Sequence, residues 1–318
     1  MIKAGISGCD DLRGHELVRV LINHPDVELM WVTARNHVGS RLEDIVPGLK
    51  GESDLMVTAV GSLDNVDLVF TCGCRDEVSS RLPLLIGHEG LHVVNLSGCH
   101  NVDYGDDLPW KYGLGEMQRR LLVHDTRLVT VPGNVAAASL LALLPLARSQ
   151  MLASPLSLHV SLGTVLLSSG GTTLDGITLN DWATDQRREV EYALKHCQEG
   201  FDQPIDLEVT PLDGRRTLAA VARMNCSADG EMLRDLYEQY YDDHNFVFMM
   251  DRSVTPADVE NTNKCLICLE KDERAGILTV TAMMDALLKG AVGTAVHAMN
   301  LMFGLQERVG LSLKAIGC

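Results

Sequence analysis

Aromatic residues and basic clusters are what this sequence has least of. Phe, Trp and Tyr make up 4% of its 318 residues, and 43 acidic residues outnumber 27 basic ones, which gives a formal net charge of −16. So few aromatics argue against the stacking platforms that bind single-stranded nucleic acid. The acidic surplus, which no cluster of Lys and Arg offsets, argues against a nucleic-acid partner of any kind.

Long apolar runs are also lacking. The longest, near residues 136–147, falls short of the roughly 18 residues that a membrane helix needs. The opening residues "MIKAGISG" form the pattern of a strand, without the charged and apolar segments of a secretion signal. Nine cysteines in such a chain favour reduced thiols over a disulfide framework. We therefore expect a cytoplasmic protein without a membrane partner.

What the sequence does contain is the pattern of an α/β protein with room for two cores. The strand "IKAGIS", a glycine-bearing loop, the helix "GHELVRVLINH" and the strand "VELMWVTA" form a βαβ unit, the opening of a Rossmann dinucleotide-binding fold. The short apolar strands "LMVTAV", "VDLVFTC" and "LHVVNLS" follow, with a helix over residues 77–90. Alternating strands and helices of this kind predict a parallel sheet covered on both faces.

The pattern changes after residue 134, where longer runs with a period of two predict an α+β domain with an antiparallel or mixed sheet. These runs lie at residues 156–169, 205–212, 217–227, 246–250, 264–272 and 276–284. Helices are predicted at residues 186–200, 228–243 and 285–305. The domain boundary is expected near Gly133, with the last helix returning to the first domain.

The loop after the first strand carries a phosphate-binding pattern. Gly5 and Gly8 would let backbone amides approach a pyrophosphate, which the N-terminus of the following helix would hold. Asp11 takes the place of a third glycine and puts a negative charge there, which Arg13 would neutralise. The alternative is that Asp10 or Asp11 simply caps the helix.

The end of the second strand bears on which dinucleotide is bound. Rossmann folds that bind NAD have an acidic residue there, whereas an arginine accommodates the 2′-phosphate of NADP. This chain has Thr33 and Arg35, so we predict NADP as the cofactor. A solvated surface arginine is the alternative for Arg35.

Thiols gather at the predicted carboxyl edge of the sheet, where Cys9, Cys72, Cys74 and Cys99-His100 each follow a strand. Cys9 and Cys72 belong to the predicted cofactor site. Three interpretations remain open for the group: a soft-metal site, a relocated nucleophile formed by Cys99 with His100, and inert packing of small apolar side chains. Its spacing matches no known metal motif.

The segment "LVTVPGNVAAASLLALLPLA" predicts a buried strand, a sharp turn and a long apolar helix. A thiol placed just after the turn would face the helix N-terminus, whose dipole stabilises a thiolate. Asn134 occupies that position, and its carboxamide is not a nucleophile at neutral pH. Asn134 either contacts a substrate or acts only as the N-cap of the helix.

These segments resemble N-acetyl-γ-glutamyl-phosphate reductase, a relative of aspartate-semialdehyde dehydrogenase. The resemblance runs nearly end to end and is strongest in residues 24–49, 128–134, 270–280 and 285–305. It implies NADPH as hydride donor, a Rossmann domain from residues 1–133 and 290–318, and a catalytic and dimer-forming domain at 134–289. It also implies a small anionic, amino-acid-like substrate and a homodimer or homotetramer. The resemblance further implies that four residues pack beside the cofactor: Lys289, Gly290, Ala291 and Gly293.

The departures from the family pattern fall on the residues that do chemistry. The resemblance aligns the family's nucleophilic cysteine with Asn134 and its catalytic histidine with Gln186. The arginine of a Ser-Ala-Asp-Phe-Arg stretch falls on Asn101, while the glutamate of a Gly-Leu-Pro-Glu stretch is kept as Glu116. Nucleophile, base and one anion-binding residue are changed together.

Two neighbouring arginines could bind an anionic group of the substrate. Arg215 and Arg216 align with a Thr-Arg-Gly turn of the family, and Arg215 would suit a bidentate contact with a carboxylate or phosphate. A solvated pair at a sheet edge is the alternative.

Three functions follow from these patterns. The first is an NADP(H)-dependent oxidoreductase that reduces a carbonyl or imine by direct hydride transfer, with Asn134, Gln186, Glu116 and Arg215 around the substrate. The second is a non-catalytic paralogue that binds a nucleotide or a partner. The third is acyl-phosphate reduction retained through a displaced thiol such as Cys99.

Overall fold

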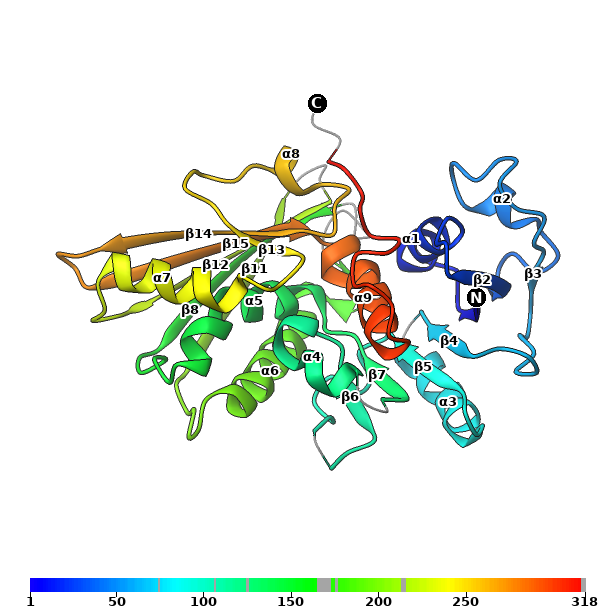
Figure 1. Ribbon diagram of the computed structural model, residues 1–318, viewed down its shortest axis with the longest axis horizontal. Coiled ribbons are helices and arrows are strands. Elements are labelled where there is room, and N and C mark those ends of the chain that lie inside the picture. Colours follow the sequence, from blue (N-terminus) through cyan, green and yellow to red (C-terminus); the bar gives the residue numbers. More distant parts are fainter. Residues whose placement is uncertain are drawn as a thin grey trace. The chain divides into compact units, whose positions relative to one another are not determined.

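The computed structural model describes residues 1–73, 75–105, 107–123, 126–164, 173–174, 177–212 and 216–315. The chain forms two compact units, one from Met1–Pro132 with Ala291–Ser312 and the other from Gly133–Gly290 with Leu313–Cys318 (Figure 1). The fold is α/β, with a parallel Rossmann-like sheet in the first unit and a mixed sheet in the second.

The first unit is built on a seven-stranded sheet of order β3-β2-β1-β4-β5-β7-β6. Every pairing in it is parallel. Its strands are β1 (Ile2–Ser7), β2 (Val27–Thr33), β3 (Val57–Thr58), β4 (Leu68–Thr71), β5 (His92–Asn95), β6 (Trp110–Tyr112) and β7 (Leu128–Thr130). The central strands β4, β5 and β7 are buried almost throughout, as in a sheet that helices cover on both faces.

The helices of the first unit include one that closes the chain back onto the sheet. They are α1 (Leu12–Leu21), α2 (Leu42–Ile45), α3 (Arg75–Gly87), α4 (Gly115–Val123) and α9 (Gly293–Met302). A π-helical turn at Leu288–Val292 precedes α9, which packs against α4 and β5. The predicted single helix over residues 285–305 is therefore wrong in detail, because it starts as this turn and has a regular α-helical part only from Gly293 on.

The second unit is built on a six-stranded sheet of order β11-β8-β12-β15-β14-β13. Its strands are β8 (Leu156–Gly163), β11 (Ile205–Leu212), β12 (Thr217–Asn225), β13 (Val247–Met249), β14 (Cys265–Asp272) and β15 (Ile277–Asp285). The sheet is mixed, because the outer pairs β11–β8 and β13–β14 are parallel while the central pairs are antiparallel. A short hairpin, β9 (Thr173–Leu174) and β10 (Ile177–Thr178), stands apart from it.

Helices α5 (Asn134–Arg148), α6 (Leu179–Cys197), α7 (Gly230–Tyr241) and α8 (Pro256–Val259) complete the second unit. Helix α5 is buried over nearly its whole length and packs on β12 and β15. Helix α6 begins earlier than the predicted residue 186, because Thr178 caps it by accepting a hydrogen bond from the Asp181 N–H at 3.2 Å. Gln186 and Glu189 lie on its buried face.

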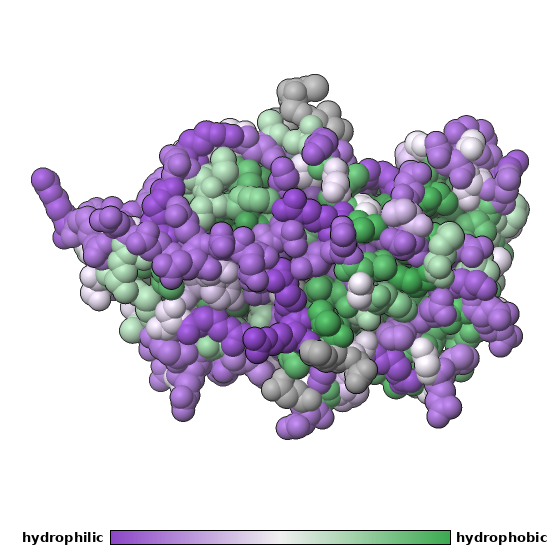
Figure 2. All heavy atoms as spheres, viewed as in Figure 1, coloured by the Kyte–Doolittle hydropathy of each residue, from purple (hydrophilic) through white to green (hydrophobic). Residues whose placement is uncertain are grey.

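Hydrophilic residues cover much of the surface seen in Figure 2, as the acidic composition leads one to expect. None of the helices in the described part of the chain combines the length and the apolar character that crossing a bilayer requires.

Candidate functional site

Two groups of predicted site residues can be described, one in each unit. The first lies at the carboxyl edge of the parallel sheet, around the loop between β1 and α1. The second lies at the N-terminus of α5. Arg215 and Cys74 lie outside the described residues.

The loop between β1 and α1 is tightly folded. Gly8 adopts a positive φ of 95°, and a Cβ there would lie 2.5 Å from the carbonyl oxygen of Cys72, so only glycine fits. The N–H of Gly8 donates to Oγ1 of Thr33 at 3.2 Å, which ties the loop to the end of β2. Gly5 lies within β1, where a Cβ would come 2.2 Å from the indole of Trp31. The structure thus gives Gly5 a packing role.

Asp11 is the N-cap of α1, and its carboxylate accepts a hydrogen bond from the Gly14 N–H at 2.9 Å. Arg13 pairs with the same carboxylate, with Nη2 2.7 Å from Oδ2. The capping alternative thus describes Asp11 correctly, and Arg13 offsets its charge. The pair removes the main electrostatic objection to a phosphate at this helix N-terminus.

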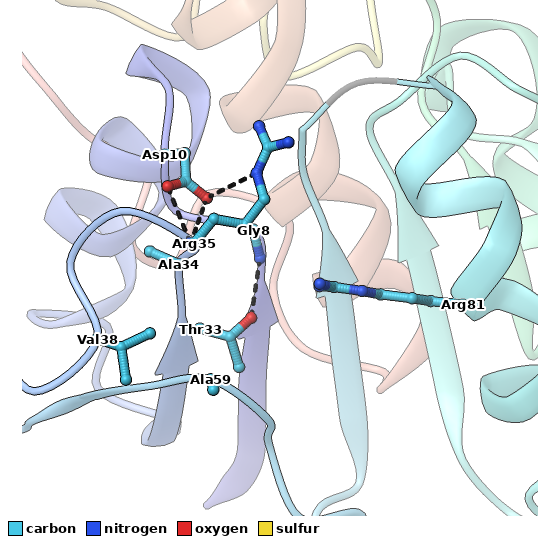
Figure 3. Close-up of a pocket in the computed structure, with 8 residues that line it drawn as sticks. All are labelled: Gly8, Asp10, Thr33, Ala34, Arg35, Val38, Ala59 and Arg81. Atoms are coloured by element: carbon cyan, nitrogen blue, oxygen red, sulfur yellow. Dashed lines mark hydrogen bonds and ion pairs between the residues drawn. The ribbon is translucent and has the colours of Figure 1, made fainter.

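The end of β2 opens onto a cavity of about 200 Å³ (Figure 3). It is lined by Gly8, Asp10, Thr33, Ala34, Arg35, Val38, Ala59 and Arg81. Asp10 accepts hydrogen bonds from the backbone N–H groups of Arg35 and Asn36 at 2.9–3.1 Å. The Arg35 side chain is 59% exposed, with its Nε 3.9 Å from Asp10.

The thiols at this edge differ in environment. Burial, reinforced by Asp11 and Asp10, raises the pKa of Cys9 to about 12, and burial raises the pKa of Cys72 well above its usual range. Both therefore remain protonated and unreactive at neutral pH. Cys99 is only half-buried, and its sulfur lies 2.7 Å from Ser97 Oγ and 3.3 Å from Asn95 Nδ2, which donates to it.

The His100 side chain contacts Trp110 and Asp103. Its ring stacks on Trp110 with centroids 4.5 Å apart, and its Nδ1 lies 3.3 Å from Asp103. Asn101 is buried and accepts a hydrogen bond from the Thr130 hydroxyl at 2.5 Å. Among the described residues, no three His, Cys, Asp or Glu side chains are grouped so that they would hold a metal ion.

The N-terminus of α5 is satisfied by side chains from α6. The N-cap is Gly133, so Asn134 is the first helical residue and not the cap itself. The N–H of Gly133 donates to Glu189 Oε1 at 3.0 Å, and that of Ala136 donates to Gln186 Oε1 at 3.1 Å. A Cβ on Gly133 would come within 2.3 Å of the Gln186 amide, so glycine permits this close approach.

Asn134 is half-exposed, and its Oδ1 accepts a hydrogen bond from the Val135 N–H at 2.8 Å. Gly290, in the π-helical turn, packs against it, since a Cβ on Gly290 would lie 2.9 Å from Asn134 Cβ. Both carboxamides, Asn134 and Gln186, thus turn their oxygens to helix N–H groups. Because of this, it is their NH₂ groups that stay available as donors.

The remaining predicted site residues are buried or paired with other side chains of the protein. Lys289 is fully buried, with its ammonium 5.5 Å from the centroid of the Phe246 ring. Gly293 opens α9, and Glu116 is buried in α4. Arg216 binds Asp285 through Nε at 3.0 Å and Nη2 at 3.2 Å, so it is not the solvated side chain that the sequence left open.

Two residues of these sites, Glu189 and Arg81, carry no motif that the sequence patterns identify. Glu189 lies three residues after Gln186 on one helix, a spacing that places both side chains on the same face and would have marked it. Arg81 reaches from α3 to Ser7 of β1, with Nη1 3.1 Å from Oγ, and no local pattern signals this contact.

Comparison with known proteins identifies the family. Residues 3–124 match the family described as "Semialdehyde dehydrogenase, NAD binding domain", and residues 135–286 match "Semialdehyde dehydrogenase, dimerisation domain". Proteins named N-acetyl-gamma-glutamyl-phosphate reductase from Parabacteroides distasonis, Phocaeicola vulgatus and Bacteroides thetaiotaomicron are 34%, 35% and 36% identical over 326 residues. Each alignment covers 99% of both chains.

The chain belongs to the N-acetyl-γ-glutamyl-phosphate reductase family of oxidoreductases. Solved structures share the fold of this reductase-family chain at lower identity. Aspartate semialdehyde dehydrogenase II from Vibrio cholerae has a TM-score of 0.72 at 14% identity, covering 96% of this chain and 98% of that one. The Candida albicans enzyme, solved with NADP, has a TM-score of 0.71 at 14% identity, covering 95% and 98%. The first unit therefore contains a nicotinamide-dinucleotide-binding domain and the second a domain of the dimerisation type.

Proposed function

We propose that this protein is an NADP(H)-dependent oxidoreductase that reduces a carbonyl or imine by direct hydride transfer. The observation that carries the proposal is the Asn134 carboxamide in the first turn of α5, beside Gln186. The resemblance to the reductase family aligns these positions with its cysteine and histidine.

A carboxamide changes which reaction is feasible. Reduction of an acyl phosphate needs a thiolate that expels phosphate and leaves a thioester. Loss of such a nucleophile costs on the order of 10⁴–10⁶ in rate. Loss of the base as well adds little, because nucleophile and base act as one unit. The thioester route is therefore not the one proposed here.

The orientation of the Asn134 and Gln186 carboxamides suits them to donate hydrogen bonds to a substrate. Asn134 Nδ2 would donate a hydrogen bond to a carbonyl oxygen or imine nitrogen and stabilise the negative charge that develops there. The helix N-terminus behind it acts in the same direction. One such donor contributes about 10²–10³ in rate in enzymes that use an oxyanion hole. Gln186 would hold the helix end in place and offer a second NH₂ group.

The residues of the first unit fit a dinucleotide. Only glycine fits at Gly8, the charge of Asp11 is offset by Arg13, and Arg35 lines a cavity at the end of β2. When bound, NADPH supplies the hydride. Thr33 and Arg35 favour NADP over NAD, because an arginine there accommodates a 2′-phosphate.

The substrate proposed is small, anionic and amino-acid-like. This rests on the relatives, whose name specifies an N-acetylated glutamyl phosphate. We also propose a homodimer or homotetramer formed through the second unit, which matches a dimerisation domain.

Replacing Asn134 tests the proposal. With NADPH and a panel of semialdehydes, 2-oxo acids and imines, Asn134→Ala should lower kcat/KM about 10²–10³-fold and leave the Kd for NADPH unchanged. Asn225→Ala, an exposed asparagine of β12, is the matched control. Full activity in Asn134→Ala would contradict the proposed role, and a wild-type protein that binds NADPH without turnover would favour the non-catalytic paralogue.

A second candidate is acyl-phosphate reduction through Cys99. It is favoured by the half-buried Cys99 sulfur, which accepts a hydrogen bond from Asn95 Nδ2 at 3.3 Å and would be oriented by it as a nucleophile. Cys99→Ala decides this candidate, because it would abolish that activity and leave the hydride transfer proposed above intact.

A further inference from the structure

The cavity at the end of β2 carries a local charge opposite to that of the whole protein. Its lining includes Arg35, Arg81 and one carboxylate, Asp10, so the cavity wall has a net positive charge in a chain of net charge −16. A positive cavity of about 200 Å³ is suited to a small anionic group.

Arg81 enters this cavity from an element that the glycine-loop motif does not include. It lies on α3, and Figure 3 shows its side chain extending from that helix toward Gly8. Its Nη1 donates to the hydroxyl of Ser7, which is itself buried at the end of β1. This contact holds the guanidinium at the cavity wall, so little side-chain entropy remains to be lost on binding.

Asp10 does not act here as the acidic residue of an NAD site does. In those sites a carboxylate at the end of β2 accepts a hydrogen bond from the ribose 2′-hydroxyl. Asp10 comes from the glycine loop, and its oxygens already accept the N–H groups of Arg35 and Asn36. The other two charged side chains of the cavity wall, Arg35 and Arg81, are cationic.

Arg35 lines the same cavity just after the end of β2, and its side chain is mostly exposed. Asp10 accepts hydrogen bonds from the backbone N–H groups of Arg35 and Asn36, and the exposed Arg35 side chain has its Nε 3.9 Å from that carboxylate. An ion pair at this distance is weak when the arginine is 59% exposed, and a phosphate dianion would compete for the guanidinium successfully.

We propose that Arg81 is a cofactor-specificity residue that binds the 2′-phosphate of NADP in this cavity, together with Arg35. The inference rests on the proposed NADP(H) function and goes beyond it by naming a second arginine, from α3. Arginine forms bidentate, charge-assisted hydrogen bonds with phosphate, which a 2′-hydroxyl cannot match.

The test compares ligands with and without the 2′-phosphate. Titration calorimetry with 2′,5′-ADP and 5′-AMP, and with NADPH and NADH, measures binding without requiring turnover. In Arg81→Gln, affinity for 2′,5′-ADP and NADPH should fall about 10–100-fold, and affinity for 5′-AMP and NADH should change less than about twofold. Arg81→Lys, which keeps the charge, should show a smaller loss.

Arg120→Gln is the matched control, since it removes the same charge from an exposed position on α4 of the same unit. Equal weakening of 5′-AMP and 2′,5′-ADP in Arg81→Gln, or no weakening of either, overturns the assignment of Arg81 while the proposed function stands. Wild-type protein that binds neither dinucleotide at millimolar concentration overturns the proposed function and this inference together.

Discussion

The Gln186 side chain binds the N-terminus of helix α5, which indicates a structural role more than a chemical one. Its Oε1 accepts the N–H of Ala136, and the residue is only 6% exposed, so we expect its replacement to affect folding before it affects chemistry. Asn134, half-exposed one residue after the N-cap, is free to serve a substrate. The two carboxamides therefore have different roles even though they face the same helix N-terminus.

We predict that Gln186→Leu destabilises the protein by about 1–3 kcal/mol. The substitution keeps the side chain's volume but leaves the buried N–H of Ala136 without its acceptor. Urea unfolding monitored by circular dichroism measures the change, with Gln306→Leu, an exposed glutamine, as the control. Equal midpoints for the two variants would show that Gln186 does not stabilise the end of α5.

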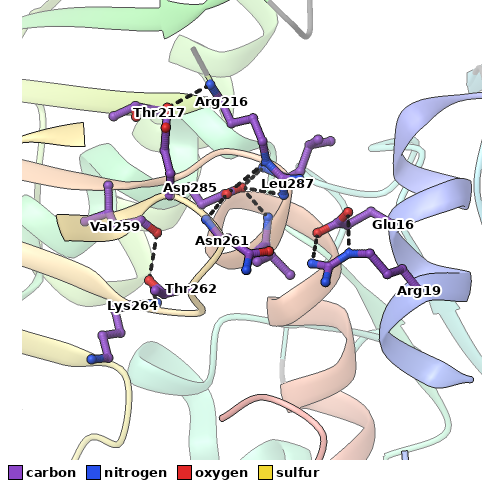
Figure 4. A network of polar contacts seen from close by, with 12 residues as sticks. Glu16, Arg19, Arg216, Thr217, Val259, Asn261, Thr262, Lys264, Asp285 and Leu287 are labelled. Atoms are coloured by element: carbon purple, nitrogen blue, oxygen red, sulfur yellow. Dashed lines mark hydrogen bonds and ion pairs between the residues drawn. The ribbon is translucent and has the colours of Figure 1, made fainter. Parts of the chain in front are cut away.

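At the scale of elements, Asp285 joins the end of β15 to the turn that leads into α9. Figure 4 shows its fully buried carboxylate surrounded by donors. These are the Arg216 guanidinium and the backbone N–H groups of Asn261, Leu287 and Leu288, at 2.8–3.2 Å. This carboxylate fixes where the π-helical turn begins, and Gly290 in that turn packs on Asn134.

Asp285→Asn should therefore cost about 3–5 kcal/mol of stability, because an NH₂ group would face donors at a fully buried position and the partly buried Arg216 guanidinium would lose its ion pair with Asp285. Thermal and urea unfolding measure this loss. Asp54→Asn, at an exposed carboxylate paired with Arg41, is expected to leave the unfolding midpoint unchanged. A midpoint for Asp285→Asn close to that of wild type would rule out the carboxylate as the organising group.

The sequence predicts an element well when neighbouring residues determine it, and poorly when contacts between distant residues do. The period-two run at residues 205–212 predicts β11 with its observed bounds, because Ile205, Leu207 and Val209 lie on a less exposed face than Asp206 and Glu208. The sequence patterns do not predict strand β6, which is three residues long, or helix α4, which is interrupted by the non-helical backbone of Gln118. The contact of Arg81 with Ser7 joins residues 74 positions apart, and that of Gln186 with Ala136 joins residues 50 apart, so only the folded chain reveals them.

At the scale of the whole molecule, stability should depend on histidine protonation. Burial lowers the pKa of His24 below its ordinary value of 6.5, and burial lowers those of His15 and His92 as well. His24 is held as the neutral ring, with Nε2 3.2 Å from Asn300 Oδ1 and Nδ1 accepting the Asp26 N–H. Below pH 6.5 the unfolded chain binds more protons than the folded one.

We predict that the free energy of unfolding is highest above pH 6.5 and falls as the pH drops below it. Each such histidine contributes at most about 1.4 kcal/mol per pH unit. Urea titrations at pH 7.5 and 5.5 measure the difference, and His24→Gln should reduce it. An unfolding free energy that rises on acidification would contradict the neutral state of these rings.

The outer face of the six-stranded sheet is the expected contact between protein copies. Along β12 and β15 the residues alternate between buried and half-exposed, and the half-exposed ones include Ala219, Val221, Thr281 and Met283. Small and apolar side chains on an uncharged central patch suit burial against a second copy.

Val221→Arg should therefore convert the oligomer into monomers at micromolar concentration, because it would bury a charge in that contact. Light scattering coupled to size-exclusion chromatography measures the mass. Val60→Arg, at a valine 81% exposed in the first unit, controls for the added charge and should stay oligomeric. Oligomers that persist in Val221→Arg would place the contact elsewhere.

The reaction proposed for this protein is reduction without an acyl-enzyme. Intact-protein mass spectrometry after mixing with N-acetyl-γ-glutamyl phosphate, with NADPH oxidation followed in parallel, tests this most directly. We predict an unmodified mass and no rapid NADPH oxidation, because Asn134 has no thiolate to accept the acyl group. A covalent acyl adduct together with fast NADPH consumption would contradict the account.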